Sequence, residues 1–138
     1  MVNPSRRPHP HFDDRGTLDW HTHWSEALAA ARAAGKLVFV EFGREQCGNC
    51  RALVQGVVPH AQVAPILEQH FIALASDCDD PEDGVSDLAL NLPDAMMLPF
   101  AMFADSQGRF LGGSEGAQSA SGFKALLESV IARANEPT

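Results

Sequence analysis

The spacing of hydrophobic and polar residues predicts an alternation of helices and short buried strands. Apolar residues recur at helical spacing at Trp24, Ala27, Leu28 and Ala31. This spacing predicts a helix that Gly35 ends. The apolar run within residues 36–42 is typical of a central strand that is covered on both faces. Residues 1–18 are rich in Pro, Arg, His and Asp without periodicity, so we expect a loosely ordered N-terminal arm.

The rest of the chain repeats this alternation and closes with a hairpin and a helix. We expect helices over residues 51–58, 60–70, 80–92 and 119–134, and strands over 71–76, 100–104 and 109–112. Asp80-Pro81 predicts an N-cap followed by the first residue of a helix. The short turn at residues 105–108 forces an antiparallel pair, whereas the helical connections permit parallel strands before it. The fold class is therefore α/β.

Composition narrows the range of functions. The chain has 138 residues, enough for one domain, and a formal net charge of −8, which argues against nucleic acid or an anionic membrane as partner. No apolar run approaches the roughly 20 residues that a spanning helix needs, so we expect no membrane insertion. No signal peptide is visible, which predicts a cytoplasmic protein, or a periplasmic or exported one if a native signal peptide was removed. We expect a monomer.

The most informative motif is Cys47-Gly48-Asn49-Cys50, which follows the first buried strand and opens a helix. Two cysteines at this spacing, at a strand-to-helix turn, are typical of a reversible disulfide. Unpaired N–H groups and the positive helix end favour the thiolate of Cys47. Cys50 shares a helical face with Leu53, Val54 and Val57, which predicts that Cys50 is buried and Cys47 accessible.

Other interpretations of the cysteines remain open at this stage. A metal carrier could use the two cysteines together with histidines at positions 9, 11, 21 and 23, although solvated histidines are the default and a structural zinc site usually needs four ligands. An interaction module with incidental cysteines is a third possibility. We expect no metal and no cofactor. Cys78, the odd third cysteine, precedes two acidic residues and is interpreted as a bystander.

The element order, with CxxC after the first central strand, resembles the thioredoxin fold over residues 24–131. Glu41, six residues before Cys47, matches the buried acid of that family, and Leu98-Pro99 matches its cis-proline loop. The resemblance implies a central mixed sheet flanked by helices, with an N-terminal arm at 1–18 and a thioredoxin-like domain at 19–138. Within the superfamily, the chain is most similar to the group that includes the C-terminal domains of bacterial thiol:disulfide interchange proteins.

The resemblance implies a thiol–disulfide oxidoreductase, a reductase or isomerase, that exchanges disulfides with protein substrates and an upstream redox partner. Cys47 would attack and Cys50 would resolve the mixed disulfide. Gly48 keeps the turn uncrowded, and Asn49 adds a dipole without charge.

Two further positions have supporting roles in this hypothesis. Glu41 either moves a proton to or from Cys50 or is a strand-end acid that reaches solvent, and a cis Pro99 would hold a backbone edge for substrate. The chain departs from thioredoxins at Gln46, where they carry tryptophan, at Asn49, and at Leu98 before the proline. These departures leave the direction of electron flow and the partner open.

Overall fold

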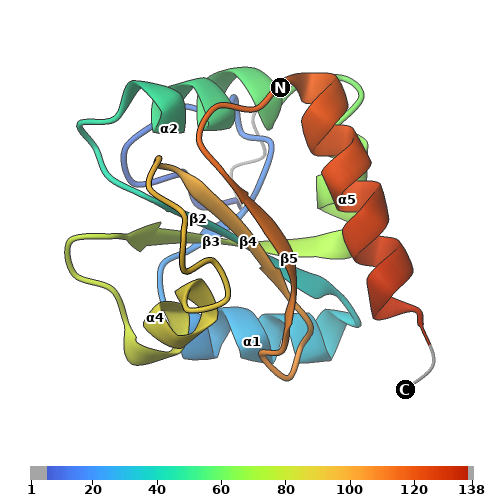
Figure 1. The fold of residues 1–138 in the computed structure, drawn as a ribbon. Helices are drawn as coiled ribbons and strands as arrows, with labels where there is room; N and C mark the ends of the chain where they lie inside the picture. The colour runs from blue at the N-terminus through green and yellow to red at the C-terminus, as the bar shows by residue number, and fades with distance from the viewer. Residues whose placement is uncertain (1–5, 137–138) are drawn as a thin grey trace.

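The computed structural model describes residues 6–136, which form one five-stranded sheet between two layers of helices (Figure 1). The strands are β1 (Trp20–His21), β2 (Leu37–Gly43), β3 (Phe71–Asp77), β4 (Phe100–Ala104) and β5 (Phe110–Glu115). The α-helices are α1 (Trp24–Ala34), α2 (Gly48–Ala52), α3 (Ala64–His70), α4 (Asp83–Ala89) and α5 (Ala120–Ala134), and a π-helical turn, Leu53–Val57, continues α2. Within the described residues, no helix is long and apolar enough to cross a membrane.

The sheet is mixed, as the sequence predicts. Its strand order is β1-β3-β2-β4-β5, with β1 and β2 parallel to β3, β4 antiparallel to β2, and β5 antiparallel to β4. In this register, Glu41 of β2 lies between Ala75 of β3 and Ala101 of β4. These two small neighbours leave space around the Glu41 side chain at the centre of the sheet.

Each face of the sheet is covered by its own hydrophobic cluster, because β2 alternates its apolar side chains between the two faces. On one face, Phe39 stacks on Phe103 at 5.4 Å between ring centroids, under side chains from the π-helical turn, α3 and α5. On the other face, Val38 and Val40 pack against α1 and α4. The expectation that residues 36–42 form a central strand with both faces covered is confirmed.

Some element boundaries differ from the predicted ones. Helix α4 begins at Asp83 with Glu82 as its N-cap, rather than at Pro81, because Asp80 is held in a turn by its N–H bond to the Asp77 carbonyl. The two-residue strand β1 is too short to leave a periodic signal, although Trp20 and His21 pair with Ala73 and Leu74 of β3.

The N-terminal segment, defined here as residues 6–18, packs on the sheet instead of forming a loosely ordered arm. Phe12, Leu18, His9, Asp14 and Thr17 are all buried. The arm's first five residues lie outside the described part of the chain, and the domain boundary after residue 18 stays a prediction. The absence of periodicity in this segment therefore reflects irregular backbone, and its packing comes from contacts far apart in sequence.

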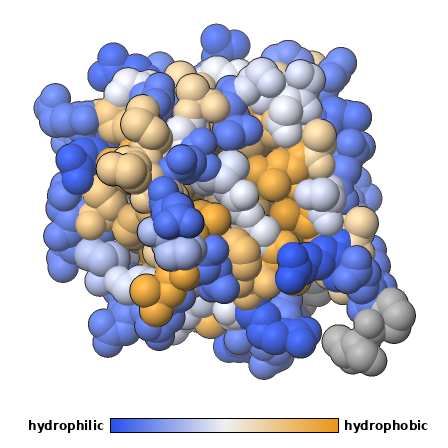
Figure 2. Space-filling view, viewed as in Figure 1, coloured by the Kyte–Doolittle hydropathy of each residue, from blue (hydrophilic) through white to orange (hydrophobic). Residues whose placement is uncertain are grey.

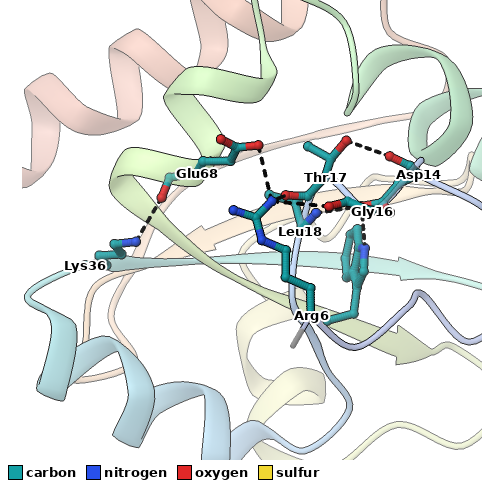
Figure 3. A network of polar contacts seen from close by, with 8 residues as sticks. Arg6, Asp14, Gly16, Thr17, Leu18, Lys36 and Glu68 are labelled. Atoms are coloured by element: carbon teal, nitrogen blue, oxygen red, sulfur yellow. Dashed lines mark hydrogen bonds and ion pairs between the residues drawn. The ribbon is translucent and has the colours of Figure 1, made fainter. Parts of the chain in front are cut away.

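A polar network fastens this segment (Figure 3). The Arg6 guanidinium donates to the carbonyls of Gly16 and Thr17 and lies 3.4 Å from Glu68 Oε1. Its other centre is buried Asp14, whose Oδ2 accepts from the Leu18 N–H (3.0 Å) and the Trp20 indole N–H (2.9 Å). Asp14 thereby satisfies two donors that the apolar surroundings would otherwise leave unpaired.

Candidate redox site

The two cysteines of the CxxC motif form a disulfide at the start of α2. Their Cα atoms are 5.2 Å apart, and the Cys50 N–H donates to Cys47 Sγ at 3.1 Å. Cys47 is the N-cap residue and is half-buried, whereas Cys50 is 0% exposed. The predicted burial of Cys50 and accessibility of Cys47 are confirmed. This arrangement makes Cys47 the more accessible of the two cysteines and encloses Cys50.

The loop before β4 lies against the CxxC turn. The Leu98–Pro99 peptide bond is cis, as the resemblance implies, and the Asn49 side-chain amide donates to the Leu98 carbonyl at 3.3 Å. Gly48 is exposed, and a Cβ added to it would meet nothing within 4 Å. Asn49 therefore joins the turn to the proline loop, a role that sequence reasoning did not assign to its amide.

Glu41 is buried beneath the disulfide, with 2% of its surface exposed, rather than reaching solvent from the strand end. Its Oε1 lies 2.7 Å from His9 Nε2, whereas Oε2 is buried without a hydrogen-bond partner among the described residues. Burial raises the pKa of Glu41, and the hydrogen bond from His9 opposes this rise. Glu41 can therefore hold a proton at a higher pH than an exposed glutamate can.

Gly43 separates the unpaired Glu41 oxygen from the buried sulfur. A Cβ at this position would collide with Glu41 Oε2 and would lie 2.6 Å from Cys50 Sγ. Both atoms therefore face the same small space, which exists because residue 43 has no side chain. The absence of a Cβ gives Gly43 a steric role that sequence reasoning did not identify.

The N-terminal segment also borders Cys47. A cleft of about 350 Å³ beside Cys47 is lined by His11, Phe12, Glu45, Gln46, Gly48 and Arg51. The Arg51 guanidinium lies over the Phe12 ring, 5.9 Å from its centroid. No sequence signal linked residues 11 and 12 to this cleft, because the contact spans about 35 positions and follows no periodicity.

Hydrophobic side chains gather near the loop that leads into β4, which contacts the CxxC turn. Figure 2 shows a patch of hydrophobic residues at the upper left of the view, over this loop. Met96 and Met97 are exposed by 87% and 56%, while Met102 is fully buried in the core. Exposed methionines directly before Leu98-Pro99 give the edge beside the disulfide an adaptable apolar surface.

The four N-terminal histidines do not converge on the cysteines. His9 and His21 are buried, with His9 held by Glu41 and His21 contacted by Arg7, whereas His11 and His23 are exposed. Within residues 6–136, the potential metal ligands that cluster are Asp77, Cys78 and Asp79, away from the CxxC motif in sequence. The metal-carrier interpretation finds no ligand set at the CxxC motif in this part of the chain.

Cys78 has a neighbour that the sequence interpretation overlooked. Besides the acidic side chains next to it, the Arg44 guanidinium lies 3.3 Å from its Sγ and 2.9 Å from Asp79 Oδ1. A cation thus offsets the negative neighbours on which the bystander interpretation rested.

The mixed sheet, the cysteine pair at the start of α2 and the cis-proline loop against it define a protein of the thioredoxin class. The Thioredoxin-like family profile matches residues 19–106, and the chain belongs to this family.

Individual relatives also fit this class. The chain is 27% identical over 134 residues to the thiol:disulfide interchange protein DsbD of Pseudoalteromonas atlantica. The matched region covers 95% of this chain but only 22% of that relative. Among solved structures, a thioredoxin from Thermus thermophilus superposes with a TM-score of 0.70 at 26% identity, covering 86% of this chain and 91% of that one. A putative disulphide-isomerase from Bacteroides thetaiotaomicron gives a TM-score of 0.64 at 26% identity, covering 88% and 94%.

Proposed function

We propose that this protein is a thiol–disulfide oxidoreductase that exchanges disulfides with protein substrates through Cys47 and Cys50. The observation that carries the proposal is the asymmetry of the pair, with half-buried Cys47 at the helix start and fully buried Cys50 behind it. A purely structural disulfide does not need one sulfur at the mouth of a cleft. Exchange does, because the attacking thiolate must reach a sulfur of another molecule.

In the reductive direction, the Cys47 thiolate attacks a substrate disulfide, forms the mixed disulfide and releases one substrate thiolate. The Cys50 sulfur then attacks Cys47 Sγ, the pair closes, and the second substrate thiolate leaves with the two electrons. Glu41 serves as the proton acceptor for Cys50, because its free oxygen faces the same space as Cys50 Sγ. Run backwards, the same steps oxidise a dithiol.

Substrate specificity follows from the two sides of the site. The edge at Leu98-Pro99, with its exposed methionines, offers an extended backbone and an apolar surface to a peptide that carries the target disulfide. The cleft on the other side offers the cation of Arg51.

Protein disulfides persist mainly outside the cytosol, which favours an exported protein over a cytoplasmic one. An upstream redox partner regenerates the dithiol.

The roles of the two cysteines can be tested by trapping. Cys50→Ser should accumulate mixed disulfides through Cys47, whereas Cys47→Ser should abolish exchange and trap nothing. Cys78→Ser is the matched control, because it removes a thiol outside the pair and should leave exchange unchanged. In the reduced wild-type protein, iodoacetamide should modify Cys47 before Cys50. Preferential alkylation of Cys50, or trapping through Cys78, would overturn the proposal.

A further inference from the structure

His9 lies outside the residues that match the family profile, yet its ring is buried against the redox site, with 1% of its side chain exposed. Its Nδ1 accepts hydrogen bonds from the backbone N–H groups of His11, at 3.0 Å, and Phe12, at 3.2 Å. An imidazole nitrogen that accepts two N–H bonds carries no proton of its own. The hydrogen of the neutral ring is therefore on Nε2, the nitrogen that faces Glu41.

Packing holds this ring in one orientation. His9 stacks on Phe12 at 5.3 Å and meets the Trp20 indole edge-on at 4.7 Å, both between ring centroids. Trp20 is in turn fixed by its hydrogen bond to Asp14. A ring confined on these sides cannot exchange its two nitrogens without moving the segment that carries it.

The fixed ring makes the two Glu41 oxygens unequal. His9 Nε2–H donates to Oε1 at 2.7 Å, so a proton on Oε1 would displace this hydrogen bond, whereas a proton on Oε2 leaves it intact. Oε2 is the oxygen that faces the gap at Gly43 and the Cys50 sulfur. We propose that His9 is a positioning residue that occupies Oε1 and so directs proton transfer to Oε2, on the side of Cys50.

Several other charged groups lie near Glu41. Exposed His11 lies in the same segment, and it lines, together with Asp77, Asp80 and Glu82, a pocket of about 190 Å³ that reaches Glu41 and His9. The neighbouring strands contribute only Ala75 and Ala101 at this level of the sheet. Among these groups, His9 is the one that contacts the Glu41 carboxylate directly.

The step that His9 assists is the resolution of the mixed disulfide by Cys50, so this role rests on the proposed exchange function. When Cys50 resolves the mixed disulfide, its thiol proton passes to Glu41 Oε2 while the Cys50 sulfur bonds to Cys47 Sγ. The bond between Cys47 and the substrate sulfur breaks, and the substrate thiolate takes the electron pair. Charge and atoms balance, because one carboxylate becomes a carboxylic acid as one thiol becomes part of a disulfide. His9 keeps its own proton throughout.

The test compares three variants of the full chain. His9→Phe keeps the aromatic packing but removes the donor, and His9→Gln places an amide N–H near the position of Nε2. His60→Phe is the control, because exposed His60 also accepts a backbone N–H at Nδ1, from Gln62 at 3.1 Å, and does not contact Glu41. Each reduced protein is mixed with a saturating disulfide-bonded peptide, and the single-turnover rate is followed across pH.

We expect His9→Phe to lose about tenfold in rate at the acidic end of the pH range, since it lacks a hydrogen bond to the charged carboxylate, and to approach the wild-type rate as the pH rises. His9→Gln and His60→Phe should keep the wild-type profile. A loss in His9→Phe that is uniform across pH, or no loss at all, would overturn the positioning role. If wild type itself fails to reduce the peptide, the proposed exchange function fails instead.

A second measurement needs no variant. Imidazole ¹⁵N shifts of the wild-type protein distinguish the two neutral tautomers and the imidazolium. We expect the Nε2–H tautomer for His9 in both the oxidised and the reduced protein, because Nδ1 accepts two backbone N–H groups. An Nδ1–H ring or an imidazolium at His9 would overturn it, whether or not His9→Phe folds.

Discussion

Replacing Gly43 with alanine tests whether the Glu41 carboxylate and the Cys50 sulfur meet in one confined space. The added Cβ would collide with Glu41 Oε2 and lie 2.6 Å from Cys50 Sγ, with further contact at 3.4 Å to the Cys50 Cβ. Both neighbours are buried and Cys50 is tied into a disulfide, so neither can withdraw easily. Overpacking of this kind typically costs about 1–3 kcal/mol.

The matched control is Gly56→Ala. Gly56 lies in the π-helical turn, and a Cβ there would meet nothing within 4 Å. Alanine in a helical segment gains up to about 1 kcal/mol over glycine, so this variant should be neutral or slightly stabilised. The two variants make the same chemical change and differ only in what the methyl group meets.

Urea unfolding of the oxidised proteins, read at equal m-values, gives the free energies directly. At roughly 4 °C per kcal/mol for a chain of this size, Gly43→Ala should also lower Tm by about 4–12 °C. Wild-type stability in Gly43→Ala would refute the reasoning, because it would mean that the acid and the sulfur do not share this space.

Three further predictions concern the acid, the N-terminal segment and the redox couple. Glu41→Gln should flatten the pH dependence of stability. Burial raises the folded pKa of Glu41 above its ordinary 4.5, so the folded state binds the proton more tightly, and stability falls as pH rises from 4.5 through the raised pKa. Urea unfolding from acid to neutral pH should show the free energy of unfolding of the variant rising relative to that of wild type. Parallel curves of this free energy against pH would contradict the prediction. Asp14→Ala should cost about 2–4 kcal/mol, because the N–H groups of Leu18 and Trp20 both lose their acceptor, whereas Asp94→Ala, at an exposed position, should stay within about 0.5 kcal/mol. The Cys47–Cys50 couple should equilibrate with glutathione at roughly −200 to −260 mV, since Asn49 supplies neither the rigidity of proline nor a titratable ring, and a value near about −120 mV would show that the reduced state is stabilised far more than expected.

The sheet and the cysteine pair could be predicted because their signals are local. The apolar run of β2, the spacing of Cys50 with Leu53 and Val54, and the turn before β5 each lie within a few residues. The Leu98–Pro99 bond was predictable only through the family resemblance, because a cis bond leaves no mark on hydrophobic spacing. A local sequence pattern predicts a helix or strand, but it does not predict which distant segment packs against that element.

The parts that escaped prediction depend on contacts between distant residues. His9 meets Glu41 across 32 positions, and no pattern in residues 6–18 announces that their side chains are buried. The start of α4 was misplaced for a related reason, because the turn that occupies Asp80 is set by the end of β3. The N-cap at Glu82 also makes a remote contact, since its carboxylate accepts the N–H of Trp24.

The pairing of β1 with β3 also bears on how the chain is made. Trp20 is synthesised before its partner Ala73, which follows about 50 residues later; at 5–20 residues per second this is roughly 3–10 s of translation. During that interval Trp20 and Phe12 have no sheet to cover, so these two aromatic side chains stay exposed on the nascent chain, beside residues that are mostly polar. Chaperone binding to the nascent chain, or slowed translation before β3 emerges, would therefore act first on the residues that later enclose the acid beneath the disulfide.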